Sequence, residues 1–199
     1  MLLLPPSFSG PGAQAFLQKL TPSSLSALVP FSSTLSVLLN AEGGILDDTV
    51  VTKHADDRFY VVTNAGRRAE DLAWFESQLA TWAQAEANEK GEVKHEVLDG
   101  WGLVALQGPK AAEVLAKLVD RGSVDLKTLT FGKSAYGKLN GVECHIARGG
   151  YTGEDGFEVS ILPLLISHFL HNTHDYVDFR TDLHSAQAHR CHHRSPARH

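Results

Sequence analysis

The sequence predicts an α+β fold in which antiparallel sheets are flanked by helices. Three β-rich runs separated by short turns favour an antiparallel meander. A Gly-Pro turn followed by an amphipathic helical pattern occurs twice, at Gly10-Pro11 and at Gly108-Pro109. Two copies of strand, turn and helix indicate two related α+β halves, because a solenoid needs more repeats.

The alignment of the two copies supports a real repeat. Residues 8–20 align with residues 106–118, and the matching positions include the Gly-Pro pair, an alanine, two leucines and a lysine. In each copy the proline stands at the first helical position, which suits its fixed φ and missing N–H. A Gly-Pro pair before a helix is common, so the matching apolar spacing is what favours a real repeat.

The elements of the first half follow from β-branched runs and the turn residues between them. The predicted strands after the first helix are residues 34–39, 45–53, 58–63 and 93–98. Asn64-Ala65-Gly66 ends the third of these runs of strand residues. From Arg67 to about Ala87, large apolar residues recur at three- and four-residue steps, which predicts a long amphipathic helix that Gly91 ends.

The second half continues with residues 102–106, which predict a strand before the second repeat helix. Residues 134–136 and 142–147 predict two strands joined at Asn140-Gly141, a pair typical of a hairpin turn. A glycine-dense loop that starts at Arg148 then enters a strand that ends before Pro163.

Composition is that of an ordinary globular protein. The chain has 199 residues, with 43% hydrophobic and 21% charged residues. A net charge of -5 gives no reason to expect nucleic acid as a partner. No apolar run approaches the ~20 residues of a membrane span. The two cysteines, Cys144 and Cys191, are expected to be reduced thiols.

The last part of the chain differs from the rest. Residues 1–163 are expected to form the α+β region, and residues 164–199 an aberrant, disordered tail. Eight of the eleven histidines lie after Ser167, and no acidic residue follows Asp182. A His-rich stretch without carboxylates or cysteines around it is more often disordered than metal-binding, so we expect no metal site.

The first candidate functional group is the hexapeptide Gly-Gly-Ile-Leu-Asp-Asp at residues 43–48. Its glycines give a turn that a ligand can approach, and its two acids lie at the start of a predicted strand. Adjacent strand residues point to opposite faces, so one acid of Asp47 and Asp48 can face a pocket. The alternative is an ordinary hairpin with an acidic turn.

Two further groups are Asn64, at the end of an apolar strand, and the segment from Tyr151 to Glu158. Tyr151 can stack on a ring, and glycines let the backbone approach a flat ligand. A buried Glu158 needs a donor partner, and the paired N–H groups of a pterin edge would provide one. Dinucleotide, P-loop, serine-elbow and zincin motifs are absent. Taken alone, each group has an equally good structural explanation.

In this order and at these spacings, the groups resemble the aminomethyltransferase of the glycine cleavage system, the T-protein family. The resemblance covers residues 8–163 and rests on five stretches: Phe-Ser-Gly-Pro-Gly-Ala at 8–13, Leu-Asn-Ala-Glu-Gly-Gly-Ile-Leu-Asp-Asp at 39–48, Tyr-Val-Val-Thr-Asn-Ala-Gly at 60–66, Leu-Gln-Gly-Pro at 106–109 and Gly-Tyr-Thr-Gly-Glu-Asp-Gly-Phe-Glu at 150–158. It implies a folate-binding aminomethyltransferase-like fold that is incomplete at both ends.

The resemblance implies a tetrahydrofolate-dependent transferase. The methylene unit of an aminomethyl group, carried on the lipoyl arm of the H-protein, passes to tetrahydrofolate, and ammonia is released. Tetrahydrofolate is thus the implied co-substrate and the lipoylated H-protein the implied partner. In eukaryotes the family is mitochondrial, although no leader is visible in this chain. No metal, nucleic acid or membrane is implied.

The resemblance also implies roles for individual residues. Asp47, the first acid of the pair, would address the folate nitrogen that attacks the aminomethyl carbon. Asn64 would lie in a segment that lines the folate pocket, Tyr151 would flank the ring system, and Glu158 would accept the pterin's paired donors.

The chain departs from the family at both ends. The segment expected before Phe8 is missing or replaced, and neither the helix that carries a folate-contacting arginine nor the final β-rich domain is recognisable in residues 164–199. Weak folate binding and poor turnover are therefore expected. Two alternatives stay open: a non-catalytic folate-binding module, and a truncated product without independent function. Asp47 beside the Gly43-Gly44 turn favours enzyme ancestry.

Overall fold

A computed structural model of the chain describes residues 6–98 and 101–161. It contains one nine-stranded sheet in the order β5-β1-β4-β3-β2-β7-β8-β9-β6, with antiparallel pairing between neighbours. The strands are β1 (Pro6–Ser9), β2 (Ser32–Leu39), β3 (Ile45–Ala55), β4 (Arg58–Val62), β5 (Lys94–Val97), β6 (Gly102–Gln107), β7 (Lys133–Leu139), β8 (Val142–Arg148) and β9 (Gly156–Ile161). The predicted tail, residues 164–199, lies outside the described residues.

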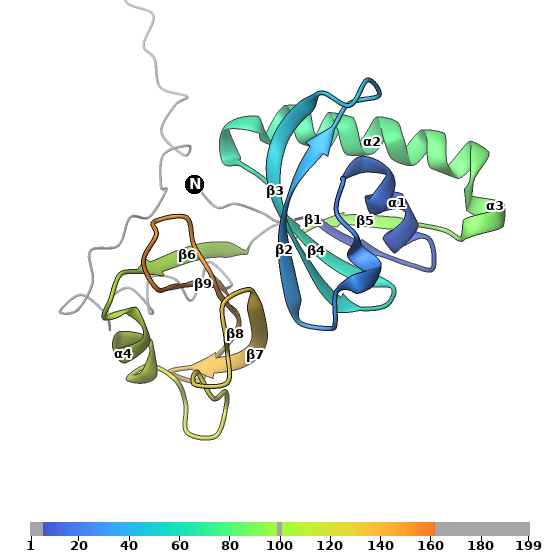
Figure 1. Cartoon of the computed structure of the whole chain (residues 1–199). Coiled ribbons are helices and arrows are strands. Elements are labelled where there is room, and N and C mark those ends of the chain that lie inside the picture. The colour runs from blue at the N-terminus through green and yellow to red at the C-terminus, as the bar shows by residue number, and fades with distance from the viewer. Residues whose placement is uncertain (1–5, 99–100, 162–199) are drawn as a thin grey trace, which may run out of the picture.

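Six helical segments accompany the sheet in the described ranges. They are α1 (Ala13–Leu20), η1 (Leu25–Ala27), η2 (Ala65–Arg67), α2 (Arg68–Ala85), α3 (Ala87–Lys90) and α4 (Ala111–Ala116). Figure 1 shows α1, α2 and α3 beside the strands of the first half, and α4 beside those of the second. The predicted α+β fold of antiparallel strands with flanking helices is confirmed. None of the described helices is long and apolar enough to cross a membrane.

The strand order repeats within the sheet. The sequence β1-α1-β2-β3-β4 gives the spatial order β1-β4-β3-β2, and β6-α4-β7-β8-β9 gives the equivalent order β6-β9-β8-β7. The two units meet head to head at β2 and β7, which pair at Ser32 and Lys133. The two copies of the sequence repeat, β1-α1 and β6-α4, therefore occupy equivalent places about an approximate two-fold axis.

The first half encloses its own aromatic core. Phe8 packs between Phe16 of α1 and Phe75 of α2, with ring centroids 5.7 Å and 5.1 Å away. Trp82, buried on the same helix, donates its indole N–H to the carbonyl oxygen of Gly91 at 3.0 Å. These contacts bury the apolar stripe that the helical spacing predicts.

The predicted long helix differs from the observed one at both ends. It begins with the short turn η2, and it breaks at Glu86, whose φ of -128° separates α2 from α3. Gly91, with φ of +93°, then turns the chain back so that it packs against Pro11, which lies two residues before α1 and not at its first position as predicted. A side chain at position 91 would collide with that turn, so the approach of two distant segments fixes this end.

The second half has a separate, mostly aliphatic core under α4. It is formed by buried residues of α4, β6, β7, β8 and β9 and the loops between them, including Leu106, Leu115, Ile146, Phe157 and Val159. The β7–β8 hairpin turns at Asn140 and Gly141, both with positive φ, as the Asn-Gly pair predicts. Because each half has its own core, the space between the halves is free to form a cavity.

Candidate functional site

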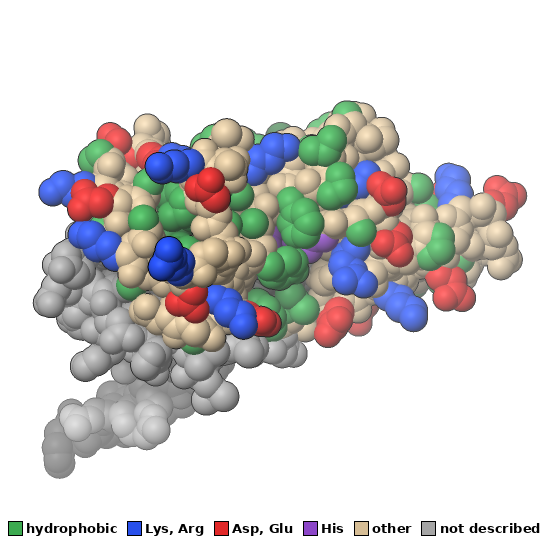
Figure 2. Space-filling view, turned by 90° about the horizontal axis from the view of Figure 1, so that it is seen from below, with side chains coloured by type: hydrophobic (Ala, Val, Ile, Leu, Met, Phe, Trp, Pro, Cys, Tyr) green, Lys and Arg blue, Asp and Glu red, His purple; other side chains and the backbone are tan. Residues whose placement is uncertain are grey.

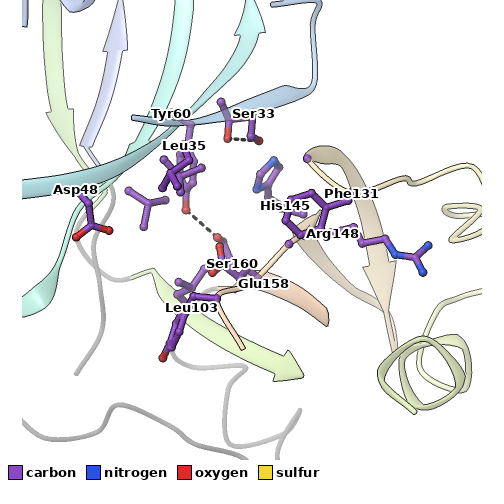
Figure 3. A pocket seen from close by; sticks show the side chains of 18 residues that line it. Ser33, Leu35, Asp48, Tyr60, Leu103, Phe131, His145, Arg148, Glu158 and Ser160 are labelled. Atoms are coloured by element: carbon purple, nitrogen blue, oxygen red, sulfur yellow. Dashed lines mark hydrogen bonds between the residues drawn. The ribbon is translucent and has the colours of Figure 1, made fainter. Parts of the chain in front are cut away.

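A cavity of about 340 Å³ lies between the two halves. Figure 3 shows side chains of β2, β3 and β4 on one side of it and of β6, β8 and β9 on the other. Figure 2 shows hydrophobic side chains exposed among charged ones on one face of the molecule, with histidine among them. The lining residues are Ser33, Leu35, Asp48, Val50, Thr52, Tyr60, Val62, Leu103, Phe131, Gly132, His145, Ala147, Arg148, Gly149, Gly150, Tyr151, Glu158 and Ser160.

Equivalent positions of the two halves line this cavity. In the first half, cross-strand pairs of β3 and β4 contribute, namely Val50 with Val62 and Thr52 with Tyr60. In the second half, the matching pairs of β8 and β9 are His145 with Ser160 and Ala147 with Glu158. The cavity therefore lies on the approximate two-fold axis, and its ionisable groups distinguish one side from the other.

Strand alternation sends the two acids of the hexapeptide to opposite faces of β3. Asp48 is exposed and lines the cavity with Val50 and Thr52. Asp47 is buried on the other face, where its carboxyl contacts that of Asp71 on α2. The period of two in a strand requires this division.

Asn64 links the two acids. Its backbone N–H donates to Asp47 Oδ2 at 3.1 Å, and its Nδ2 donates to Asp47 Oδ1 at 3.0 Å. The same Nδ2 donates to Asp48 Oδ1 at 2.8 Å. Asn64 thus fixes the Asp48 carboxylate by a hydrogen bond, although Asn64 itself does not line the cavity.

The role expected of Asp47 toward the ligand stays a prediction. The structure places Asp48 at the cavity and buries Asp47 on the opposite face of the strand. The Gly43-Gly44 turn also lies off the cavity, where the Asn40 side chain accepts the Gly44 N–H at 2.7 Å. These glycines close the β2–β3 hairpin, as the ordinary-hairpin alternative holds.

Glu158 and Tyr151 both line the cavity, on β9 and on the loop before it. Burial raises the pKa of the Glu158 carboxyl above its usual range. Nearby, the Tyr60 hydroxyl hydrogen-bonds that of Ser160 at 2.7 Å and joins the two halves beneath the cavity (Figure 3). Tyr151 is 88% exposed, so its ring is available to cover a ligand from the rim.

The cavity is acidic because Arg148, the cation among its described lining residues, is already paired with an acid. Arg148 donates from Nε and Nη2 to the two carboxylate oxygens of Asp155, at 2.8 Å and 2.7 Å. In Figure 3 its guanidinium points away from the cavity. Among the described lining residues, Asp48 and Glu158 are therefore acids without a neighbouring free cation. Such a site favours a ligand that offers N–H donors.

Two histidines meet at the junction beside the cavity. The Nε2 atoms of His54 and His145 lie 3.2 Å apart, so one ring donates and the other accepts. Burial, and then His54, lower the pKa of His145 to about 3, and burial, and then Arg58, lower that of His54. The pair is consequently neutral near pH 7 and adds no charge to the cavity.

Several lining residues were not identified from the sequence: Leu35, Tyr60, Phe131, His145 and Ser160. Strand period could have found some of them, because Ser160 follows Glu158 by two residues on the same face. No local signal marks Tyr60 or His145, which reach the cavity only because the two halves come together.

Comparison with known proteins shows the family of the chain. The family model of the GCVT N-terminal domain matches residues 6–169. The chain belongs to this family. The resemblance of the sequence to the T-protein family is thereby confirmed. The GCVT N-terminal domain assignment covers both halves of the sheet and every residue around the cavity.

Relatives of this GCVT N-terminal domain include two fungal proteins. The "Probable aminomethyltransferase, mitochondrial" of Schizosaccharomyces pombe is 46% identical over 152 residues, which are 76% of this chain and 37% of that protein. The "Aminomethyltransferase, mitochondrial" of Saccharomyces cerevisiae is 45% identical over 163 residues, 80% of this chain and 39% of that protein. The chain therefore spans about two fifths of the length of these relatives.

A solved structure also resembles the GCVT N-terminal domain described here. The crystal structure of glycine cleavage system aminomethyltransferase T from Bartonella henselae matches with a TM-score of 0.68 and 35% identity. The match covers 84% of this chain and 42% of that one. The two-half sheet is thus shared with a protein of that name.

Proposed function

We propose that the chain is the folate-binding part of a tetrahydrofolate-dependent aminomethyltransferase of the glycine cleavage system. The observation that carries the proposal is the cavity between the halves, in which Asp48 and Glu158 present carboxylates and the described lining residues offer no free cation. Reduced folate offers N–H groups on its pterin ring and on the atoms that react, and both acids suit such donors.

In this reaction the methylene unit leaves the aminomethyl-lipoyl arm of the H-protein and becomes bonded to two nitrogens of tetrahydrofolate. The two protons lost from those nitrogens end on ammonia and on the lipoyl sulfur, so the reaction needs no oxidant. Positive charge develops on the carbon as the amine or thiol departs. A carboxylate at Asp48 would stabilise that charge and hold the attacking nitrogen.

The remaining lining residues fit an orienting role. Glu158 would accept paired N–H donors of the pterin ring, and Tyr151 would cover the ring from the rim. Asn64 would act on the ligand through Asp48, to which it donates at 2.8 Å. Orientation of this kind accelerates a reaction between two bound groups without a covalent enzyme intermediate.

Binding is the first test. Anaerobic calorimetric titration of the chain with tetrahydrofolate should give saturable binding at one site. Asp48→Asn and Glu158→Gln should each weaken it about tenfold or more, because a charge-assisted hydrogen bond contributes about 1.5–3 kcal/mol. Glu154→Gln, an exposed acid of the loop that carries Tyr151, is the control and should bind normally. Unchanged affinity in both cavity variants would contradict the proposal.

Transfer and location are further parts of the proposal. Addition of aminomethyl-loaded H-protein to the folate-bound chain should yield ammonia and methylene-tetrahydrofolate in equal amounts. We also propose that the protein acts in mitochondria, since the names of both fungal relatives include that location. Folate binding without any transfer would favour the alternative of a non-catalytic folate-binding module.

A further inference from the structure

A pair of buried carboxyl groups lies behind the cavity, on the opposite face of β3. Asp71, in the first turn of α2, is 2% exposed, and its carboxyl contacts that of Asp47. Two ionised carboxylates are acceptors only, so they cannot hydrogen-bond to one another. A close contact between them requires a proton on one of them.

The surroundings of Asp71 also favour a proton. Its Oδ2 is buried and has no hydrogen-bond partner, which is costly for an ionised oxygen. The groups that face it are Asp47 on β3, the Thr63 hydroxyl and Arg67 of η2. Arg67 lies 3.6 Å from Glu70, which shares its charge. Burial, and then Asp47, raise the pKa of Asp71 to about 7 against the smaller effects of Thr63 and Arg67.

Asp47 connects this pair to the cavity through Asn64. Both Asp47 oxygens accept hydrogen bonds from Asn64, at 3.1 Å from its backbone N–H and at 3.0 Å from Nδ2. The two hydrogens of Nδ2 can serve both acids, because Nδ2 also lies 2.8 Å from Asp48 Oδ1. Asp48 then lines the cavity. A continuous path of contacts thus runs from Asp71 to the proposed folate site.

We propose that Asp47 and Asp71 share one proton and act as positioning residues that fix the Asn64 amide, and through it the Asp48 carboxylate, at the cavity. The protonated pair carries one negative charge. Loss of the shared proton puts two charges in contact in a buried place and drives the carboxyl groups apart. Asn64 then loses its fixed acceptor, and Asp48 loses its fixed donor. The consequence for ligand binding rests on the proposed function, whereas the shared proton does not.

The shared proton can be tested without any ligand. In protein with ¹³C-labelled aspartate carboxyls, one titration step of the pair should occur near pH 7, and the Asn64 side-chain amide resonance should shift with the same midpoint. Asp71→Asn should abolish both steps. Glu76→Gln, which removes an exposed acid of the same helix, should leave both unchanged.

Two results would overturn the shared proton. One is that every aspartate of the wild-type chain titrates below about pH 5, the ordinary range for this residue. The other is an Asn64 amide resonance that stays constant while the carboxyl titrates. Both observations use the wild-type chain, so the proposal is decided even if Asp71→Asn fails to fold.

The positioning role is tested by the pH profile of tetrahydrofolate affinity. Between about pH 6 and about pH 8.5 the wild-type affinity should fall about tenfold, which corresponds to loss of one charge-assisted hydrogen bond. Asp71→Asn, which imitates the protonated acid, should keep the affinity measured at about pH 6 over the whole of this pH range. An equal fall in this variant would overturn the positioning role. If the wild type binds no tetrahydrofolate, the proposed function fails, while the resonance titration still decides the shared proton.

Discussion

Glu158 should make folate binding depend on pH on the acidic side. Burial raises the pKa of its carboxyl in the free protein, and N–H donors of a ligand would favour the charged form and lower that pKa again. Between the two pKa values, binding must release a proton. Affinity therefore weakens as the pH falls through the raised pKa of the free protein.

Calorimetry can measure this proton release directly. Titrations with tetrahydrofolate at pH values just above the ordinary titration range of glutamate, in buffers of different ionisation enthalpy, should show proton release for the wild type. Glu158→Gln should release few protons on binding, and its tetrahydrofolate affinity should depend less on pH on the acidic side, because an amide does not titrate. The same release in the variant would mean that another group carries the proton.

At the scale of single residues, the sequence predicted which residue types form the site. It did not predict which of two neighbouring acids faces the ligand. Tyr151 and Glu158 were expected at a pocket, and both line the cavity. Asp47 and Asp48 could not be separated, because the run after them is β-branched on both faces. The face was decided by α2, whose Asp71 meets Asp47 across a large distance in sequence.

At the scale of elements, the β7–β8 hairpin depends on its turn. Gly141 has φ of +80°, and a Cβ built there would meet nothing within 4 Å, so only backbone strain opposes a side chain. Gly141→Ala should lower the free energy of unfolding by about 1–2 kcal/mol, the cost of the left-handed conformation for an L-residue. The midpoint of urea denaturation measures this change.

Gly66 is the matched control for that substitution. It is exposed, its φ is not in the left-handed region, and its Cβ would also meet nothing within 4 Å. Gly66→Ala should change stability by less than about 0.5 kcal/mol or raise it slightly. Equal destabilisation by both substitutions would show that loss of glycine, not the turn conformation, is responsible.

Elements with a strong local signal were predicted well. The Asn140-Gly141 turn and the three-strand run β2-β3-β4 follow from residue types alone, and both are present. The break of the long helix at Glu86 was not predicted. The segment after the break is held where Gly91 packs against Pro11. That contact joins segments far apart in the chain, and no local pattern encodes it.

At the scale of the whole molecule, the junction between the halves should be sensitive to acid. His145 is buried there with its pKa lowered to about 3, whereas an unfolded histidine titrates near about 6.5. As pH falls between these values, the unfolded chain binds a proton that the folded chain does not. The stability contributed by neutral His145 is thus complete above about pH 6.5 and is lost toward pH 3.

Urea denaturation at several pH values tests this dependence. From about pH 7 to about pH 4 the wild type should lose roughly 3 kcal/mol through His145. Asp71 has the opposite sign, since its raised pKa makes stability fall as pH rises from about 4 to about 7. His145→Gln removes the first contribution alone, so its stability should fall less with acid than that of the wild type. Parallel curves for the two proteins would contradict the prediction.

The repeat in the sequence predicted the two halves of the sheet but not how they pack together. Residues 8–20 and 106–118 mark equivalent strand-turn-helix units, and the strand order shows the same equivalence. Nothing in either copy indicates that β2 would pair with β7, or that a cavity would form beside that pair. The junction consists of the Ser32–Lys133 pair, the backbone hydrogen bonds on either side of it, and side-chain contacts such as that of Tyr60 with Ser160, which are 100 residues apart.

The position of the cavity at this junction has a consequence for any molecule that occupies it. A bound molecule that touches Asp48 on one side and Glu158 on the other adds contacts between the two halves to those that already join them. Saturation with such a molecule protects both halves from unfolding together, by an amount that grows with the logarithm of its concentration.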